Sequence, residues 1–145
     1  MTVDTIQTVM EICSVLFLAR VFGHIYVLYR SPSWLPPFDH WYSGTISYRS
    51  VFTTQMCMLS ICLFGLLDVW YVLGIFGHPF WRAICPTMIV LCYIYFGGMI
   101  FRYIWTMARK PERRWFKRTI PIWAHMLVAI YNYCLCHFIL ATYPL

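Results

Sequence analysis

Four long apolar stretches constrain what this chain can fold into. They span residues 5–29, 51–76, 83–107 and 120–143. Each has roughly the 20 residues that an α-helix needs to cross about 30 Å of hydrocarbon. Barrel strands would show an alternation of apolar and polar residues, and these stretches show none. Because a bilayer core offers the backbone no hydrogen-bond partners, we expect each stretch to be a transmembrane helix.

The composition supports a single membrane domain over residues 1–145. Hydrophobic residues make up 61% of the chain and charged residues 11%, whereas about 25% of the residues in a soluble domain are charged. This balance excludes a soluble globular protein, a disordered chain and a disulfide-rich secreted domain. The connections between the stretches are too short to hold a soluble domain. The sequence therefore predicts an all-α integral membrane protein, with four transmembrane helices in an up-down bundle.

The basic residues predict how the chain is threaded. If the loop at 109–118 faces the cytoplasm, eight of the eleven Lys and Arg residues lie on the cytoplasmic side. Only Arg82 lies on the opposite side, and Arg20 and Arg102 lie within helices. Cytoplasmic loops are typically enriched in Lys and Arg, so both termini should face outward. The net charge of +6 thus indicates membrane orientation, and we expect no nucleic-acid partner. The eight cytoplasmic residues are Arg30, Arg49, Arg109, Lys110, Arg113, Arg114, Lys117 and Arg118.

Two arginines lie at membrane depth, where charged groups are costly and are candidates for function. Arg20 and Arg102 fall in the inner halves of the first and third stretches, and neither has an obvious acidic partner at its own depth. Arg102 is close enough to the headgroups to extend its side chain toward them. Arg20 lies deeper. We expect these two residues to contact a partner subunit, a lipid phosphate or a cofactor carboxylate.

Two histidines suggest a cofactor site as an alternative. His24 and His125 both lie about five residues from the inner end of their stretches, hence at similar depth. Two histidines on different helices can ligate one haem b, and a nearby arginine could pair with a propionate. In this respect the plan resembles haem-carrying membrane anchors, at the level of architecture alone. A haem b or quinone site for electron transfer is therefore an alternative, and hydrogen bonding to neighbouring helices is the simpler interpretation of both histidines.

A second candidate site lies in the outer half of the membrane. Glu11, Asp68 and His137 could approach one another if the first, second and fourth helices converge. Carboxylates and an imidazole suit a divalent metal or a proton relay. This set would make the chain a small membrane enzyme or transporter. However, no pair among them has the i, i+3 or i, i+4 spacing of a strong helix-borne metal motif.

The cysteines and the missing motifs argue against several enzyme classes. All seven cysteines fall within the apolar stretches, which favours a packing role over disulfides. The chain contains no G-x-S-x-G, H-E-x-x-H, phosphate-binding glycine loop or C-x-x-C-H motif. The leading hypothesis is therefore a non-catalytic accessory or structural subunit of a larger membrane protein complex. It would sit in a membrane of the bacterial cytoplasmic type and contact other subunits or phospholipids through its intramembrane charges.

The threading makes a prediction that a reporter fusion can check. A reporter that is active only in the cytoplasm should give no signal when it is fused to the C-terminus, because the Lys/Arg distribution places that end outside. The same reporter inserted into the loop at 109–118 should be active. A strong signal from the C-terminal fusion would contradict the orientation.

Overall fold

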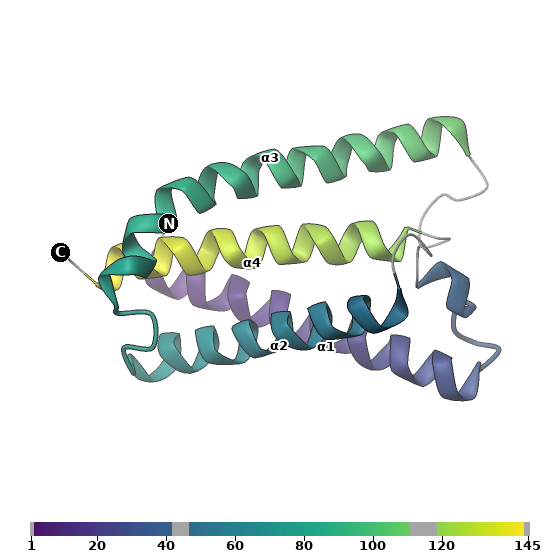
Figure 1. The fold of residues 1–145 in the computed structure, drawn as a ribbon, viewed down its shortest axis with the longest axis horizontal. Helices are drawn as coiled ribbons and strands as arrows, with labels where there is room; N and C mark the ends of the chain where they lie inside the picture. Colours follow the sequence, from purple (N-terminus) through teal and green to yellow (C-terminus); the bar gives the residue numbers. More distant parts are fainter. Residues whose placement is uncertain (1, 42–46, 111–118, 144–145) are drawn as a thin grey trace.

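The computed structural model describes residues 2–41, 47–110 and 119–143, and it is helical (Figure 1). The helices are α1 (Val3–Arg30), α2 (Tyr48–Tyr71), α3 (Pro79–Arg109) and α4 (Ile120–Thr142). A short 3-10 helix, η1 (Phe38–His40), follows α1. The four long helices are each long and apolar enough to cross a membrane, and the described ranges contain no strand. Most of the basic loop, residues 111–118, lies outside the described residues.

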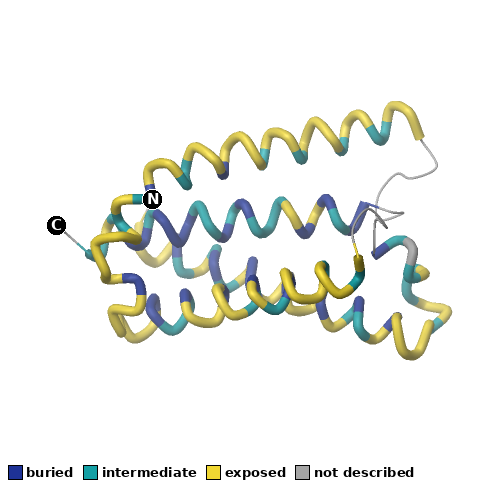
Figure 2. The backbone as a smooth tube through the Cα atoms, viewed as in Figure 1, coloured by how far each residue is buried: buried dark blue, intermediate teal, exposed yellow. Residues whose placement is uncertain are grey.

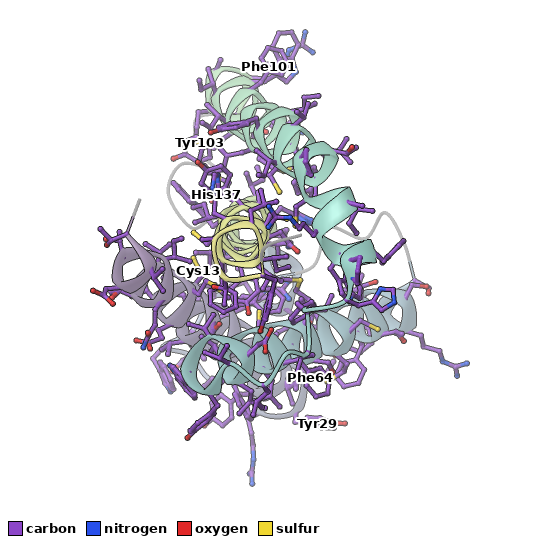
Figure 3. All side chains as sticks on the ribbon, turned by 90° about the vertical axis from the view of Figure 1, so that its left-hand side faces the viewer. Cys13, Tyr29, Phe64, Phe101, Tyr103 and His137 are labelled. Atoms are coloured by element: carbon purple, nitrogen blue, oxygen red, sulfur yellow. The ribbon has the colours of Figure 1, made fainter. Side chains whose placement is uncertain are left out.

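One helix, α4, packs against all three others. Helix α1 also packs against α2, whereas α3 packs extensively only on α4 within the described part of the chain. Figure 1 shows the start of α1, the turn between α2 and α3, and the end of α4 at the same end of the molecule. In the end-on view of Figure 3, α4 lies between α3 and the pair formed by α1 and α2, and Phe101 and Phe64 point away from it.

Local sequence signals fix where three of the helices begin. The hydroxyl of Thr2 accepts a hydrogen bond from the backbone N–H of Thr5, and the hydroxyl of Ser47 accepts one from Ser50. The side chain of His78 does the same for α3. The first turn of a helix has backbone N–H groups without intrahelical partners, and these side chains satisfy some of them.

The side chain of Asp68 shapes the end of α2. The apolar run predicts a helix that extends to residue 76, but α2 ends at Tyr71, where Val72 adopts a left-handed backbone with φ of 49°. The two carboxylate oxygens of Asp68 accept hydrogen bonds from the backbone N–H groups of Ile75 at 3.0 Å and Phe76 at 3.1 Å. Asp68 is fully buried. Its carboxylate therefore stabilises a turn at residues that hydropathy alone predicts to be helical.

The core forms around α4, and Tyr131 is its anchor. The hydroxyl of Tyr131 donates a hydrogen bond to the backbone carbonyl of Cys62 on α2 at 2.9 Å. Gly65 makes this approach possible, because a Cβ atom there would overlap the Tyr131 hydroxyl. Figure 2 shows α4 largely buried and α3 largely exposed. The side chains of α3 therefore face outward along most of its length.

The cysteines lie where the sequence places them, within the helices. All seven are free thiols, and only Cys57 is exposed. Buried thiols on apolar helix faces pack as small hydrophobic groups. The structure thus gives them no role in cross-linking the chain.

Substituting Gly65 should destabilise the bundle. Gly65→Ala forces the buried Tyr131 away from α2, and such overpacking costs about 1–3 kcal/mol. Gly97→Ala is the matched control, because a Cβ atom at Gly97 meets nothing within 4 Å and alanine is the better helix former. Thermal unfolding of the purified variants in mild detergent measures the difference. Equal melting temperatures for Gly65→Ala and wild type would contradict this packing.

Removing the carboxylate of Asp68 should also lower stability. Asp68→Ala leaves the N–H groups of Ile75 and Phe76 without their acceptor, and we expect a loss of about 2 kcal/mol. Asp4→Ala removes a carboxylate from an exposed position in the first turn of α1 and should change the melting temperature little. If both variants melt with the wild type, Asp68 does not hold the turn.

Candidate functional site

A groove bordered by α2 and α3 brings together most of the polar residues that the sequence places in the inner half. It has a volume of about 320 Å³. Its apolar lining includes Phe17, Met58 and Ala124, all of them buried. We call it the basic groove. Its polar lining residues are Arg20, Thr54, Gln55, Tyr95, Arg102 and His125.

Arg20 enters the basic groove from α1 and is only partly satisfied. Its Nη2 donates a hydrogen bond to the backbone carbonyl of Trp41 at 3.3 Å. Its Nε is buried and has no hydrogen-bond partner. Gly23 allows this arrangement, because a Cβ atom there would come within 2.6 Å of the Trp41 ring. The indole N–H of Trp41 in turn donates to the carbonyl of Pro36 at 2.9 Å, which fixes the loop beside Arg20.

The opposite side of the basic groove is built from α3 and α4. The hydroxyl of Tyr95 lies 2.7 Å from Nδ1 of His125, and the two rings meet edge to face. Arg102 lies two helical turns beyond Tyr95 on the same face of α3 and is exposed. Among the residues that the structure describes, no Asp or Glu lines the groove. The site is therefore rich in hydrogen-bond donors and carries two guanidinium groups without a carboxylate among them.

His24 lies behind the basic groove rather than in it. The ring is 1% exposed and stacks on Trp41, with the rings of Phe38 and Tyr48 also in contact distance. Its Nδ1 lies 3.4 Å from the amide nitrogen of Gln55. Both His24 Nε2 and Gln55 Oε1 are buried without a hydrogen-bond partner. The two histidines therefore do not face one open space, as the two axial ligands of a haem must.

The outer candidates have separate partners. The carboxylate of Glu11 accepts hydrogen bonds from the indole N–H of Trp70 at 2.8 Å and from Gln7 at 3.0 Å. Asp68 closes the turn after α2, and His137 packs edge to face on Tyr133. Within the described ranges, no three His, Cys, Asp or Glu residues gather closely enough to hold a metal ion. The structure thus does not assemble Glu11, Asp68 and His137 into one site.

Several contributors were not singled out from the sequence. Gln55 could have been found because it is an isolated amide in an apolar run. Tyr95 could have been found because it lies two helical turns before Arg102, which places both residues on one helix face. Arg82, the basic residue that the sequence places on the outer side, donates to the backbone carbonyls of Leu140 and Tyr143 at the end of α4. The dipole of a helix stabilises a cation at this end.

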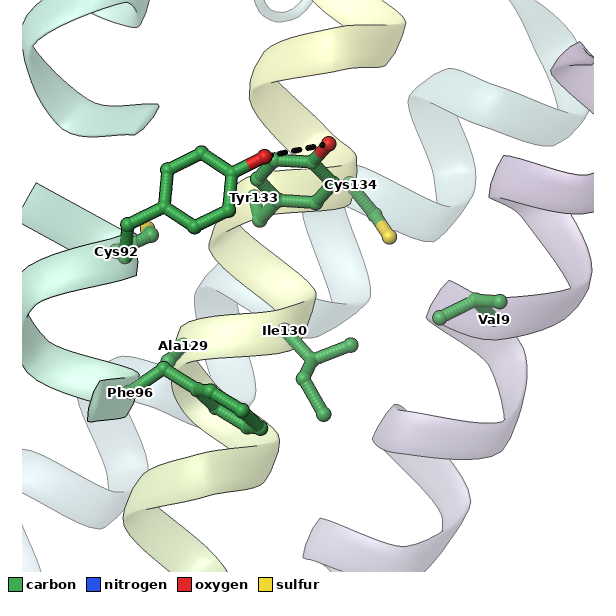
Figure 4. Close-up of a pocket in the computed structure, with 8 residues that line it drawn as sticks. Val9, Cys92, Phe96, Ala129, Ile130, Tyr133 and Cys134 are labelled. Atoms are coloured by element: carbon green, nitrogen blue, oxygen red, sulfur yellow. Dashed lines mark hydrogen bonds between the residues drawn. The ribbon is translucent and has the colours of Figure 1, made fainter. Parts of the chain in front are cut away.

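A second cavity lies on the other side of the pair formed by α3 and α4. It has a volume of about 340 Å³ and is bordered by Val9 of α1 (Figure 4). Cys92 and Ile130 are among its apolar lining residues, and the hydroxyl of Tyr93 donates to that of Tyr133 at 3.2 Å. The described residues that line it include no charged side chain, so the cavity suits hydrocarbon chains. Of these two cavities, the basic groove is therefore the one that presents charged side chains.

Comparison of the chain with protein-family models, with curated proteins and with solved structures found no match. The function is therefore argued from the geometry of the basic groove.

Proposed function

We propose that the chain is an integral membrane protein with four spanning helices in up-down order, and that it acts as a non-catalytic accessory subunit. In this arrangement both termini face outward and the basic groove lies in the inner half of the membrane. Its task is to hold an anionic group that belongs to another molecule of a membrane assembly. The proposal unites the charge pattern of the loops with the geometry of the groove.

The buried Nε of Arg20 is the observation that carries the proposal. This N–H group has no acceptor within the described residues, and no carboxylate lines the groove around it. A guanidinium keeps its charge at any relevant pH, so it cannot escape by losing a proton. An arginine near the membrane centre costs at least about 2.5 kcal/mol. An anion supplied from outside the chain would offset this cost.

The depth of the groove fits a ligand that enters from the membrane. Helix α1 has 28 residues and is therefore about 42 Å long, which exceeds the hydrocarbon thickness of about 30 Å. Arg20 is about 15 Å from the inner end of α1, and Arg102 is about 10 Å from that of α3. If the overhang is shared by both ends, Arg102 lies just below the inner headgroups and Arg20 lies about 9 Å below the edge of the hydrocarbon. Both side chains can extend toward an anion near the headgroup level.

The polar groups of the groove favour binding over catalysis. The lining offers two guanidinium groups as donors, whereas the hydroxyl of Thr54 already donates to the carbonyl of Ser50, and among the described residues it has no carboxylate for acid–base work. The single imidazole at the groove surface is hydrogen bonded to Tyr95. Such a set of donors suits the recognition of an anion.

Replacing Arg20 should release the bound molecule without preventing membrane insertion. We expect Arg20→Leu to lose a component that copurifies with the wild type, because its guanidinium is the deeper of the two in the groove and its Nε has no acceptor among the described residues. Arg102→Leu should have a smaller effect, because Arg102 lies nearer the headgroups. Native mass spectrometry after gentle solubilisation measures the masses that remain bound.

Arg30→Leu is the matched control, because it removes an exposed arginine from the last turn of the same helix. It should keep every component that the wild type keeps. A wild-type protein that carries no bound lipid, cofactor or partner would contradict the proposal, as would an Arg20→Leu variant with an unchanged set of components.

A further inference from the structure

We infer that the anion in the basic groove is the phosphate of a phospholipid from the inner leaflet, with a negatively charged headgroup that bears hydroxyls. This inference rests on the proposed function and names the ligand of the same groove. Three features of the groove support it: its opening, its charge and its one unsatisfied amide.

The groove opens toward the side of the bundle. Helices α2 and α3, which border it, do not pack extensively on each other. Its exposed polar residues, Thr54, Tyr95, Arg102 and His125, lie along this opening. The closed side is formed by buried residues such as Phe17 and Ala124. In a membrane, a lateral opening faces lipid, so a lipid molecule reaches the groove without crossing an aqueous path.

The lining matches the region where a phospholipid headgroup joins its chains. Arg20 and Arg102 can donate paired hydrogen bonds to phosphate oxygens, which is the geometry that guanidinium groups favour. Phe17, Met58 and Ala124 offer apolar surface to the first carbons of the acyl chains. Basic pockets between helices on the cytoplasmic side are typical binding places for anionic lipid headgroups. A free phosphate ion would leave this apolar surface unused.

The charge of the groove selects among headgroups. An ammonium group, as in choline or ethanolamine lipids, would lie beside Arg20 and Arg102, and the described part of the lining has no carboxylate to balance it. Gln55 also lines the groove and is 5% exposed, and its Oε1 has no hydrogen-bond partner. A headgroup hydroxyl can donate to this oxygen, and it can equally accept from the amide nitrogen if the amide is turned. Phosphatidylglycerol meets both conditions.

Lipid competition tests the inference. The full-length protein is placed in nanodiscs that contain equal amounts of phosphatidylglycerol and phosphatidylcholine, and the retained lipid is identified by native mass spectrometry. We expect wild type and Arg30→Leu to retain phosphatidylglycerol at least about tenfold over phosphatidylcholine, and Arg20→Leu to lose this preference. Equal retention of the two lipids by wild type would overturn the inference, as would an unchanged preference in Arg20→Leu.

A second lipid pair tests the role of Gln55. Phosphatidylmethanol carries the same single charge as phosphatidylglycerol but has no headgroup hydroxyl. Wild type should favour phosphatidylglycerol over phosphatidylmethanol by about fivefold, as one net hydrogen bond implies, and Gln55→Met should not discriminate between them. If wild type does not discriminate, the assignment of a hydroxylated headgroup is wrong.

Two further outcomes separate this inference from the proposed function. Displacement of the retained lipid by millimolar inorganic phosphate would show that free phosphate is the ligand. A protein chain that copurifies from native membranes, and is lost with Arg20→Leu while lipid retention is unchanged, would show that a partner carboxylate fills the groove. Either result overturns the lipid assignment, but the proposal that the groove holds an external anion survives. A wild-type protein that carries no bound component, or an Arg20→Leu variant that keeps every component, would overturn both.

Discussion

The packing of α4 against the other three helices is the constraint on which the rest of the structure depends. Tyr131 fixes one of these contacts, because its hydroxyl bonds to a backbone carbonyl of α2 in a space that Gly65 leaves open. Helix α3 has no other extensive contact within the described residues. The position of Arg102 and Tyr95 relative to Arg20 is therefore set through α4 and not by direct contact between the helices that carry them.

The basic groove is a consequence of this arrangement. Because α2 and α3 do not pack closely, the space between them remains open, and polar residues from all four helices line it. The loop after α1 contributes as well, since Trp41 packs over Gly23 and offers its carbonyl to Arg20. Tyr95 and His125 satisfy each other across the groove, whereas Arg20 Nε and Gln55 Oε1 keep no partner among the described residues. The open side would let a molecule that arrives laterally approach these two groups.

Hydropathy predicted the number, the type and the approximate ranges of the helices, because four long apolar stretches leave few alternatives. It did not predict the end of α2, since the hydrogen bonds from Ile75 and Phe76 to Asp68 depend on a turn that apolar residues do not reveal. Depth along the helices placed Arg20, Arg102 and His125 in the inner half, and all three line one groove. Depth carries no information about rotation around a helix axis. For that reason it could not show that His24 lies behind Trp41, or that Glu11 and Asp68 have separate partners.

The order of the helices in the sequence also bears on how the protein is made. The helix that packs against all the others, α4, is the last of the four to leave the ribosome. If the chain inserts as proposed, α3 would enter the membrane before α4, its only extensive neighbour among the described residues, is available. In the two-stage view of membrane protein folding, helices insert first and associate afterwards. During that interval α1 and α2 can pair, while Tyr95 and Arg102 on α3 face lipid or the insertion machinery. In such a pathway α3 would stay without its main packing partner until α4 arrives, and the docking of the last helix would complete the bundle.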